Sequence, residues 1–375
     1  MKISIFSAYY PFRGGIAQFN ERLVKSLDKK NEVAVFTFKK QYPNFLFPGS
    51  SQFVTTVNHD LEGRAQRIVS TFNPFSYFGA RSKLKSVKAD VFIANYWMSI
   101  FSVFLIFCSR GLKSKTKRIA IIHNLVPHEQ RFFDRYLNKL FVRNFDAFVV
   151  MSDKVKEDLL SLRPNASCMR LEHPWYDQFL DKIDREKACE KLGLDSTKKV
   201  LLFFGLIRDY KGLDLLLEGF NLLDDSYTLL IAGEFYTNKS AYTNLILDPE
   251  IMSRVKIVDK FIPDDEVHLY FSAADVSVLP YRSATQSGVT ATSFYFGVPV
   301  IATDVGGLKE TIQDMGKVVQ PDNAELLAKA ITTYFNEWQY IAFKESILAN
   351  SGKYNWDNFA EKLIEFASLS APLEG

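Results

Sequence analysis

Arg208 and Lys211 are the two side chains of this sequence whose spacing most clearly predicts chemistry. They follow an apolar stretch, residues 198–204, and lie between Gly205 and Gly212 in the pattern G-x-x-R-x-x-K-G. The guanidinium of arginine can hold two phosphate oxygens at once, and lysine adds a mobile point charge. Two cations at a helix start oppose the helix dipole, which disfavours a role as ordinary surface charge. The pattern therefore predicts a site that neutralises a diphosphate leaving group.

A second anion-binding segment is predicted where small residues separate an apolar strand, 275–279, from a helix, 289–296. The residues at the start of that helix are Ser287, Gly288 and Val289. The first backbone N–H groups of a helix have no partner within the helix and carry a partial positive charge, so they can bind phosphate without a dedicated cation. Many α/β proteins have small residues at such turns, so this spacing alone does not establish a ligand.

Both segments resemble the donor-nucleotide half of GT-B glycosyltransferases of family 4 (glycosyl transferases group 1). The resemblance is carried by the pattern at 205–212, by QSGV at 286–289 and by GVPVIATDVGGLKE at 297–310, and it extends over nearly the whole chain. It implies an α/β fold of the GT-B type, with two doubly wound, Rossmann-like domains facing a cleft. It also implies transfer of a sugar from a nucleotide-sugar donor, with retention of the anomeric configuration and without a metal ion or other cofactor.

Further donor contacts follow from this resemblance. The turn 261–267 resembles the family's base-binding turn, in which main-chain groups around Phe261 and Ile262 contact the nucleobase. The acidic residues of this turn are equally suited to capping a helix. Many family members carry two glutamates in the second segment, and Ala284 and Thr292 stand at those positions here. The QSGV loop resembles a branch that lacks these glutamates, so activity is still expected, with Thr292 as a donor contact.

The first half of the chain begins with a predicted strand, helix and strand at residues 2–8, 16–27 and 31–38. Gly14 and Gly15 lie at the carboxyl end of the first strand, where α/β sheets bind ligands. In the family, this loop faces the donor sugar and the diphosphate. The alternative is that the two glycines only permit a tight turn.

His123 ends a predicted strand, 117–122, and precedes a loop that contains proline. A single histidine is more often structural than catalytic, but the family similarly carries a histidine at the end of such a strand, where it contacts the donor sugar. We therefore expect His123 to orient or stabilise the sugar. His128 and Glu129 are weaker candidates, because polar residues in a loop need no functional reason.

Two further segments of the first half carry expectations. Residues 41–80 have no clear periodicity and are expected to be irregular. Long irregular segments are usually functional or mobile, and the family binds its acceptor on the first domain, so this is the candidate acceptor region. The most apolar run, 91–107, is shorter than the roughly 20 residues that span a bilayer, and it predicts a strand followed by a buried helix.

A length of 375 residues predicts two domains. The expected division is an N-terminal acceptor-binding domain, 1–175, a donor-binding domain, 176–355, and a C-terminal helix, 356–375, that crosses back to the first domain. The three cysteines are far apart and predict neither a disulfide framework nor a zinc site. No signal-peptide pattern is found at the start, so we expect a cytoplasmic location.

Lysine and arginine are concentrated in the first half of the chain. Residues 1–175 contain 27 Lys and Arg against 13 Asp and Glu, whereas the remainder is acidic. The main basic runs are 81–88 and 110–118. Such a surface suits the anionic headgroups of the inner face of the cell membrane, and the alternative is an ordinary solvated face. We find no nucleic-acid fold signature and expect no nucleic-acid partner.

Taken together, the sequence predicts a hexosyltransferase-type glycosyltransferase that uses a UDP- or GDP-sugar. The expected acceptor is a saccharide or a lipid-linked molecule, such as a polysaccharide or glycoconjugate precursor. The expected catalytic residues are His123, Arg208 and Lys211. Two alternatives stay open: a nucleotide-sugar epimerase on the same fold, and a non-catalytic nucleotide-binding partner subunit, which the absent glutamates motivate.

Overall fold

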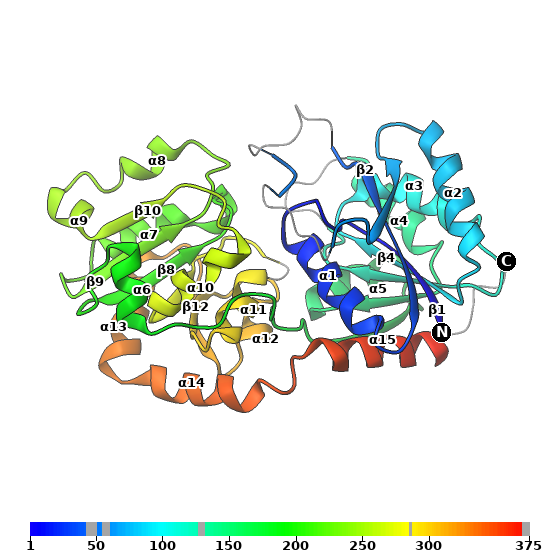
Figure 1. Cartoon of the computed structure of the whole chain (residues 1–375). Helices are drawn as coiled ribbons and strands as arrows, with labels where there is room; N and C mark the ends of the chain where they lie inside the picture. The colour runs from blue at the N-terminus through cyan, green and yellow to red at the C-terminus, as the bar shows by residue number, and fades with distance from the viewer. Residues whose placement is uncertain (43–50, 55–60, 127–131, 285–286, 370–375) are drawn as a thin grey trace. The chain divides into compact units, whose positions relative to one another are not determined.

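The computed structural model describes residues 1–42, 51–54, 61–126, 132–284 and 287–369. The chain forms two compact units. Unit 1 comprises Met1–Pro174 and Asn355–Gly375, and unit 2 comprises Trp175–Tyr354. Figure 1 shows that each unit is a β-sheet packed between helices.

Within the described residues, the sheet of unit 1 has seven strands in the order β3-β2-β1-β4-β5-β6-β7, all paired in parallel. The central strands are buried on both faces and are therefore continuous apolar runs. The order reverses between β1 and β4, so the carboxyl ends of these strands flank a switch point, where open α/β sheets bind ligands. The elements are β1 (Lys2–Phe6), α1 (Gly15–Leu27), β2 (Glu32–Lys40), β3 (Ala65–Ser70), α2 (Phe75–Val87), β4 (Val91–Tyr96), η2 (Ser99–Phe101), α3 (Ser102–Ser109), β5 (Lys117–Ile122), α4 (Asp134–Val142), β6 (Ala147–Val150), α5 (Asp153–Leu162), β7 (Ser167–Arg170) and α15 (Trp356–Leu369).

Unit 2 has, over its described residues, a six-stranded sheet in the order β10-β9-β8-β11-β12-β13, again parallel throughout. Separate apolar cores cover its two faces. The order reverses between β8 and β11, which places a switch point at the carboxyl end of β8. The elements are α6 (Arg185–Leu192), β8 (Lys199–Phe204), η3 (Asp209–Lys211), α7 (Leu213–Phe220), β9 (Tyr227–Ala232), α8 (Lys239–Thr243), α9 (Pro249–Ser253), β10 (Val255–Val258), α10 (Asp264–Ala273), β11 (Val276–Leu279), α11 (Gly288–Tyr295), β12 (Val300–Thr303), α12 (Leu308–Ile312), β13 (Gly316–Val319), α13 (Ala324–Asn336) and α14 (Gln339–Asn350).

The expectation that residues 41–80 are irregular is wrong for part of that range. The strand β3 and the first turns of α2 lie within it. The strand β3 is an edge strand with an irregular register, and only Ile68 and Val69 are buried, so its apolar pattern is short. The helix α2 leaves the rings of Phe75 and Phe78 in water, which obscures its periodicity. Residues 43–50 and 55–60 of the candidate acceptor region lie outside the described residues.

Other differences concern element ends and one helix. The predicted strand at residues 2–8 ends at Phe6, and the predicted helix at 289–296 runs from Gly288 to Tyr295. The helix α14 has no predicted counterpart, because Ile347 is its single fully buried residue and it has no apolar stripe. The apolar run 91–107 forms β4, η2 and part of α3. Over the described ranges, no helix is long and apolar enough to cross a membrane.

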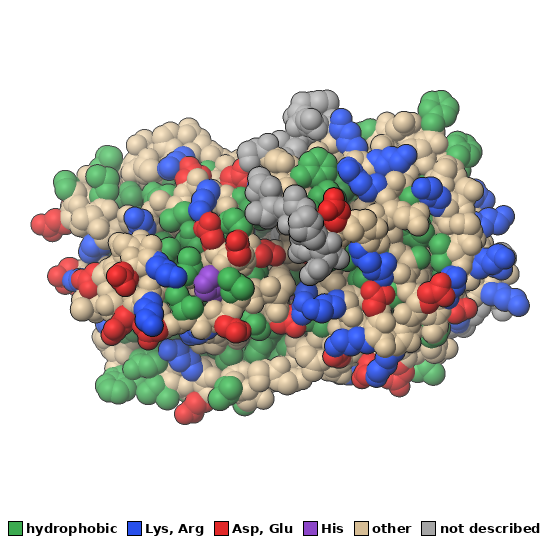
Figure 2. All heavy atoms as spheres, viewed as in Figure 1, with side chains coloured by type: hydrophobic (Ala, Val, Ile, Leu, Met, Phe, Trp, Pro, Cys, Tyr) green, Lys and Arg blue, Asp and Glu red, His purple; other side chains and the backbone are tan. Residues whose placement is uncertain are grey.

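The charges are distributed unevenly over the surface. Figure 2 shows many Lys and Arg side chains over unit 1. On unit 2, Asp and Glu side chains are mixed with Lys and Arg side chains. This agrees with the excess of basic residues in the first 175 positions of the sequence.

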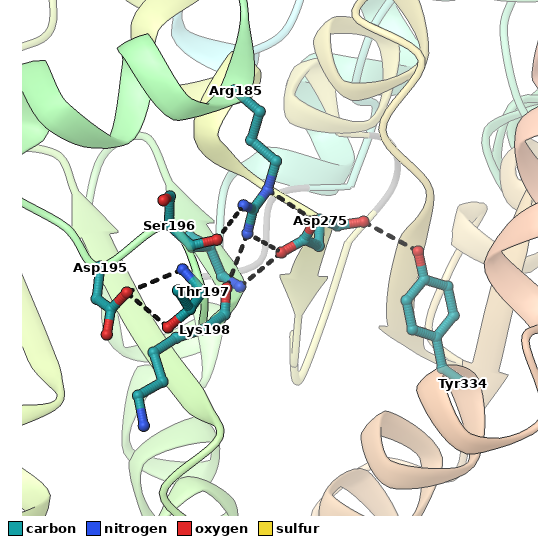
Figure 3. Close-up of polar contacts among 8 residues, drawn as sticks. Arg185, Asp195, Ser196, Thr197, Lys198, Asp275 and Tyr334 are labelled. Carbon is teal, nitrogen blue, oxygen red and sulfur yellow. Dashed lines mark hydrogen bonds and ion pairs between the residues drawn. The ribbon is translucent and has the colours of Figure 1, made fainter.

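An ion pair between Arg185 and Asp275 links several elements of unit 2 to one another (Figure 3). The Nε and Nη2 atoms of Arg185 donate to the carboxylate at 3.0 and 2.7 Å, and its remaining donors reach the carbonyl oxygens of Ser196 and Lys198. The same carboxylate accepts from the backbone N–H of Val200, at the start of β8. Because the pair joins α6 to β8 and β11, it fixes the strand that leads into the switch point.

We expect Asp275→Asn to destabilise unit 2 by about 1–3 kcal/mol, because Arg185 would lose its charged partner in a place where only 22–32% of either side chain is exposed. The matched control is Asp225→Asn, whose carboxylate is 91% exposed and lies 3.8 Å from Lys198, and which should change stability by less than about 0.5 kcal/mol. Differential scanning calorimetry measures both. Equal effects of the two substitutions would contradict the structural role of the pair.

Candidate functional site

Three predicted site residues of unit 2 meet at the carboxyl end of β8. Gly205 follows this strand with a φ of +92°, a conformation that favours glycine. A Cβ atom at Gly205 would lie 3.3 Å from Nζ of Lys211 and 3.5 Å from Cγ2 of Val289. The structure thus brings together the loop after β8 and the start of α11, two segments that are distant in sequence.

Lys211 is a buried cation. Only 8% of the residue is exposed, and it forms no ion pair with any described residue. Burial and the nearby charge of Arg208 lower the pKa of its ammonium group to about 7. The ammonium lies 5.5 Å from the ring centroid of Tyr281, a cation–π contact that replaces only part of the lost hydration. Because a buried charge without a carboxylate partner is unfavourable, this place is suited to an anionic ligand.

Arg208 directly precedes η3 and is only partly buried. Its guanidinium carbon lies 5.1 Å from the ring centroid of Tyr236. The two cations repel each other, since the charge of Arg208 contributes to the lowered pKa of Lys211. An anion in contact with both side chains would offset this repulsion. Two cations on an open surface would not need such an anion, because water screens their charges.

The helix α11 begins beside this pair of cations, with Ser287 as its N-cap residue. The Ser287 side chain makes no capping hydrogen bond to the helix but is hydrogen-bonded to the side chain of Tyr281. Gly288 packs against Tyr176, and a Cβ atom there would lie 3.2 Å from Cε2 of that ring. Tyr281 therefore contacts both predicted segments, because its ring lies under Lys211 and its side chain holds Ser287.

The other residues of unit 2 that are predicted to contact the donor make no described contact with Gly205 or Lys211. The hydroxyl of Thr292 donates to the carbonyl oxygen of Gly288, 3.0 Å away within α11. Ile262 is buried in the core that also contacts the partly buried Phe204, and Phe261 is half-buried beside it. The acidic residues after them lie in the first turn of α10, where their negative charge interacts favourably with the helix dipole. The N-cap residue of α10 is Pro263, and the helix start has no side-chain capping hydrogen bond. Residues 285–286, including the glutamine of QSGV, lie outside the described residues.

In unit 1, a chain of buried polar groups ends at His123. Nδ2 of Asn20 donates to the carbonyl oxygen of Ile16 and to the hydroxyl of Ser7. Because a carbonyl can only accept, this bond fixes the orientation of the Asn20 amide. Its Oδ1 then accepts from Nδ2 of Asn95 at 2.6 Å. Oδ1 of Asn95 is left to accept from Nε2 of His123 at 2.7 Å.

These bonds determine the protonation of His123. Nε2 must carry the proton, and burial lowers the pKa of the ring to about 3, so the imidazole is neutral near pH 7. Nδ1 therefore presents a lone pair, and no described residue donates to it. The ring is held edge-to-face by Phe19, with a centroid distance of 4.7 Å. His123 is suited to accepting a hydrogen bond from a ligand hydroxyl and is unsuited to acting as a general acid.

The remaining candidates of unit 1 lie at the start of α1 or outside the described residues. Gly14 has a φ of +110°, and a Cβ atom there would meet nothing within 4 Å, so its backbone conformation rather than crowding requires glycine. Gly15 is the first residue of α1. His128 and Glu129 lie in 127–131, which the structure does not describe.

Sequence reasoning missed four residues that position the candidates. Tyr281 and Tyr176 support the two segments of unit 2, and no spacing pattern points to them. Asn20 and Asn95 fix the tautomer of His123. Asn95 had a signal, since it is a polar residue within the apolar run of β4.

The fold and the placement of these residues define a class of protein. Two units with parallel sheets, each with its candidate site residues at a switch point, match the structures of GT-B glycosyltransferases. Two family profiles match the sequence, "Glycosyltransferase Family 4" over residues 13–171 and "Glycosyl transferases group 1" over residues 198–337. The chain belongs to this family of glycosyltransferases.

Individual relatives are more distant. The chain is 32% identical over 177 residues to a D-inositol 3-phosphate glycosyltransferase of Mycobacterium sp. (strain KMS), a match that covers 45% of this chain and 39% of the relative. The chain spans about half or less of the length of the curated relatives it matches first. Sucrose-phosphate synthase from Thermosynechococcus elongatus has a TM-score of 0.77 at 18% identity, with 98% of each chain covered. Anabaena HepE in complex with UDP-glucose has a TM-score of 0.76 at 15% identity, with 98% of this chain and 99% of that chain covered. At these identities, the two structures establish the fold alone.

The lowered pKa of Lys211 makes the stability of the free protein depend on pH. Between about 7 and the ordinary lysine value of 10.5, the unfolded chain binds a proton that the folded chain does not, so stability rises with pH over this window. Below pH 7 both forms are charged, and the folded protein carries the whole penalty of burial. We expect Lys211→Met to be more stable than the wild type by about 1–3 kcal/mol near pH 6, with a smaller difference near pH 9.

Urea denaturation at the two pH values measures this difference. Lys329→Met, which replaces an exposed lysine, is the matched control and should have the same small effect at both. A difference between Lys211→Met and the wild type that does not change with pH would contradict the burial of a titrating ammonium.

Nitrogen-15 NMR of the histidine rings tests the polar chain of unit 1. We expect His123 to stay in the neutral form with the proton on Nε2 from about pH 5 to 8, because burial opposes its charging. Asn95→Asp should raise the pKa of His123, since a carboxylate would then face Nε2. Lys362→Asp, on the exposed face of α15, should leave it unchanged. A ring that titrates near 6.5 in the wild type would refute the assignment.

Proposed function

We propose that this protein transfers a sugar from a nucleoside diphosphate sugar to an acceptor, with the diphosphate bound at the carboxyl end of β8. The observation that carries the proposal is the buried ammonium of Lys211, which has no carboxylate partner among the described residues and lies between Gly205 and the start of α11. Such a cation is stabilised when an anion occupies the site. Membership of the glycosyltransferase family supports a diphosphate as that anion.

In the proposed reaction, the bond between the anomeric carbon and the diphosphate oxygen breaks, and its electron pair stays on the diphosphate. Arg208 and Lys211 stabilise the negative charge that develops there, and the backbone N–H groups of Ser287, Gly288 and Val289 assist. The acceptor hydroxyl forms the new bond to the anomeric carbon and loses its proton. His123 accepts a hydrogen bond from a hydroxyl of the sugar through Nδ1 and stays neutral throughout.

Binding of the donor should return Lys211 to its charged form. A diphosphate diester has no group that titrates near pH 7, so any proton taken up on binding above that pH is assigned to the protein. Donor affinity is accordingly highest below pH 7, where the ammonium is already protonated, and falls as the pH rises.

The finer features belong to the same proposal. Retention of configuration, a hexose donor with UDP or GDP, and independence from a metal ion are supported by the resemblance of the motifs to the family. Two clustered cations are able to neutralise a diphosphate by themselves. The proposed acceptor is a saccharide or a lipid-linked precursor, and the proposed location is the cytoplasm. The name of one similar protein specifies D-inositol 3-phosphate, so phosphorylated polyols are included among the acceptors to be tested.

A thermal-shift panel of UDP-, GDP- and ADP-sugars, with and without EDTA, tests the donor site. A ligand at 100 times its dissociation constant stabilises the folded state by about 2.7 kcal/mol. We expect a shift with one nucleotide class that is insensitive to EDTA. Arg208→Ala and Lys211→Met should each weaken binding about 10- to 100-fold, because each removes a charge-assisted hydrogen bond. Lys329→Ala should bind as the wild type does.

The outcomes separate the proposal from its alternatives. The absence of a shift with every donor, from a folded protein, would refute the donor site. A shift without slow hydrolysis or transfer would favour a non-catalytic partner subunit. Interconversion of two nucleotide sugars without any acceptor would favour an epimerase.

A further inference from the structure

Three phenyl rings before and within the first turn of α2, in unit 1, are left in water. Phe72, Phe75 and Phe78 have 50%, 85% and 64% of their surface exposed. The opposite side of α2 already packs against the unit through Tyr77 and Leu84, so the fold does not need phenyl rings at the exposed positions. An apolar surface of this kind usually has a binding partner.

Basic and aromatic residues share one face of this helix. Phe75, Phe78, Ser82 and Lys85 recur at helical spacing, and all four are exposed. The face therefore begins with aromatic rings and ends with positive charge. This arrangement is suited to a helix that lies along a membrane surface.

The helix α3 and the loop after it extend this surface. The ring of Phe78 lies 5.0 Å from the ring of Phe107 in α3, and the guanidinium carbon of Arg81 lies 5.1 Å from the same ring. Gly111 lies directly against Arg81, because a Cβ atom there would be 2.2 Å from its Nε. The basic loop that follows Gly111 is thus brought next to α2.

The charge on these two segments is entirely positive. The sequence contains no aspartate or glutamate at 63–89 or at 91–118. Arg118 is neutralised by Asp146 of a neighbouring segment. In contrast, five exposed lysines form no ion pair with any described residue, namely Lys83, Lys85, Lys88, Lys113 and Lys115. A partner that covers this surface has to be anionic.

We propose that the aromatic–basic face, formed by Phe72, Phe75 and Phe78 with these five lysines, docks on an anionic lipid bilayer. The phenyl rings enter the boundary between headgroups and acyl chains, and the lysines contact lipid phosphates. Figure 2 shows hydrophobic side chains that project beyond the end of α2, next to Lys and Arg side chains. Phenyl rings with half or more of their surface in water are better placed to enter a bilayer than to stack on successive bases in a groove.

This inference deepens the proposed function, because it names the surface at which unit 1 would meet a membrane-bound acceptor. It does not depend on the donor site of unit 2. Each variant described below is therefore also assayed for donor-induced thermal shift, so that a failure of the donor site and a failure of membrane docking are distinguished.

Flotation with vesicles tests the proposal on the full chain. One set contains phosphatidylcholine alone, and the other contains about 30% phosphatidylglycerol, each at low and high salt. We expect binding to the anionic vesicles that is at least tenfold tighter than to the neutral ones and that weakens with salt. Lys83→Gln, Lys85→Gln, Lys113→Gln and Lys115→Gln in combination should weaken it at least 50-fold, since each lysine contributes about fivefold.

The phenyl rings are tested separately. Phe75→Ser with Phe78→Ser should weaken binding to anionic vesicles about tenfold or more, at low salt as well as at high salt. Leu222→Ser with Leu348→Ser, which removes exposed apolar side chains of unit 2, is the matched control and should change binding less than twofold. The control for the lysines replaces Lys25, Lys187, Lys329 and Lys362, which are also exposed, and loses the same charge.

Several outcomes would overturn the proposal. They are the absence of wild-type binding to anionic vesicles, equal losses in the test and control variants, and preferential binding of single-stranded nucleic acid over vesicles. Circular dichroism checks that each variant is folded. If a multiple variant is unfolded, the single variants Phe75→Ser and Lys85→Gln, which change only exposed side chains, are tested in its place.

Discussion

The burial of one positive charge, the ammonium of Lys211, constrains the loops around β8. Glycine is favoured at 205 by its φ of +92°, and a Cβ atom there would also lie 3.3 Å from Nζ of Lys211. Gly233 in turn has to be glycine, because a Cβ atom there would lie 1.9 Å from the carbonyl oxygen of Gly205. Gly212 likewise faces the carbonyl oxygen of Pro280, at 2.0 Å from its Cβ position. Close approach of the backbone at these places lets the ends of three strands converge on one ammonium group, which is held in place before any ligand binds.

In unit 1, neutral polar groups rather than a charge fix the geometry of the candidate site residue. The carbonyl oxygen of Ile16 sets the orientation of Asn20, which sets that of Asn95, which leaves only one tautomer for His123. Burial moves the pKa of His123 and that of Lys211 in the same direction, towards the neutral form. The consequences differ, because the lysine regains its proton near neutral pH when an anion arrives, whereas the histidine, with a pKa of about 3, remains a hydrogen-bond acceptor.

Much of the fold could be predicted because the central strands are continuous apolar runs and the main helices have clear apolar faces. The strand at 117–122 was predicted with the observed ends, and the C-terminal helix expected at 356–375 begins at Trp356 and extends to Leu369 within the described residues. Elements that bury little, such as β3 and α14, give a weak periodic signal and were missed. Arg208 and Lys211 could be found from their spacing, but Tyr281 could not, since its role depends on a contact between two loops that are distant in sequence.

The last helix illustrates why such contacts matter for the site. The helix α15 belongs to unit 1, although the whole of unit 2 separates it in sequence from the rest of that unit. Its ion pairs with Lys29 and Lys30 are exposed to solvent, which screens them, so they contribute little to stability. Trp356 and Phe359 instead pack edge-to-face on Phe19, which also packs edge-to-face with the ring of His123. The apolar contact therefore carries most of the attachment of α15, and it also fixes the imidazole. Because Phe19 is shared by both contacts, the geometry of the histidine is complete only after the end of the chain has folded back onto α1.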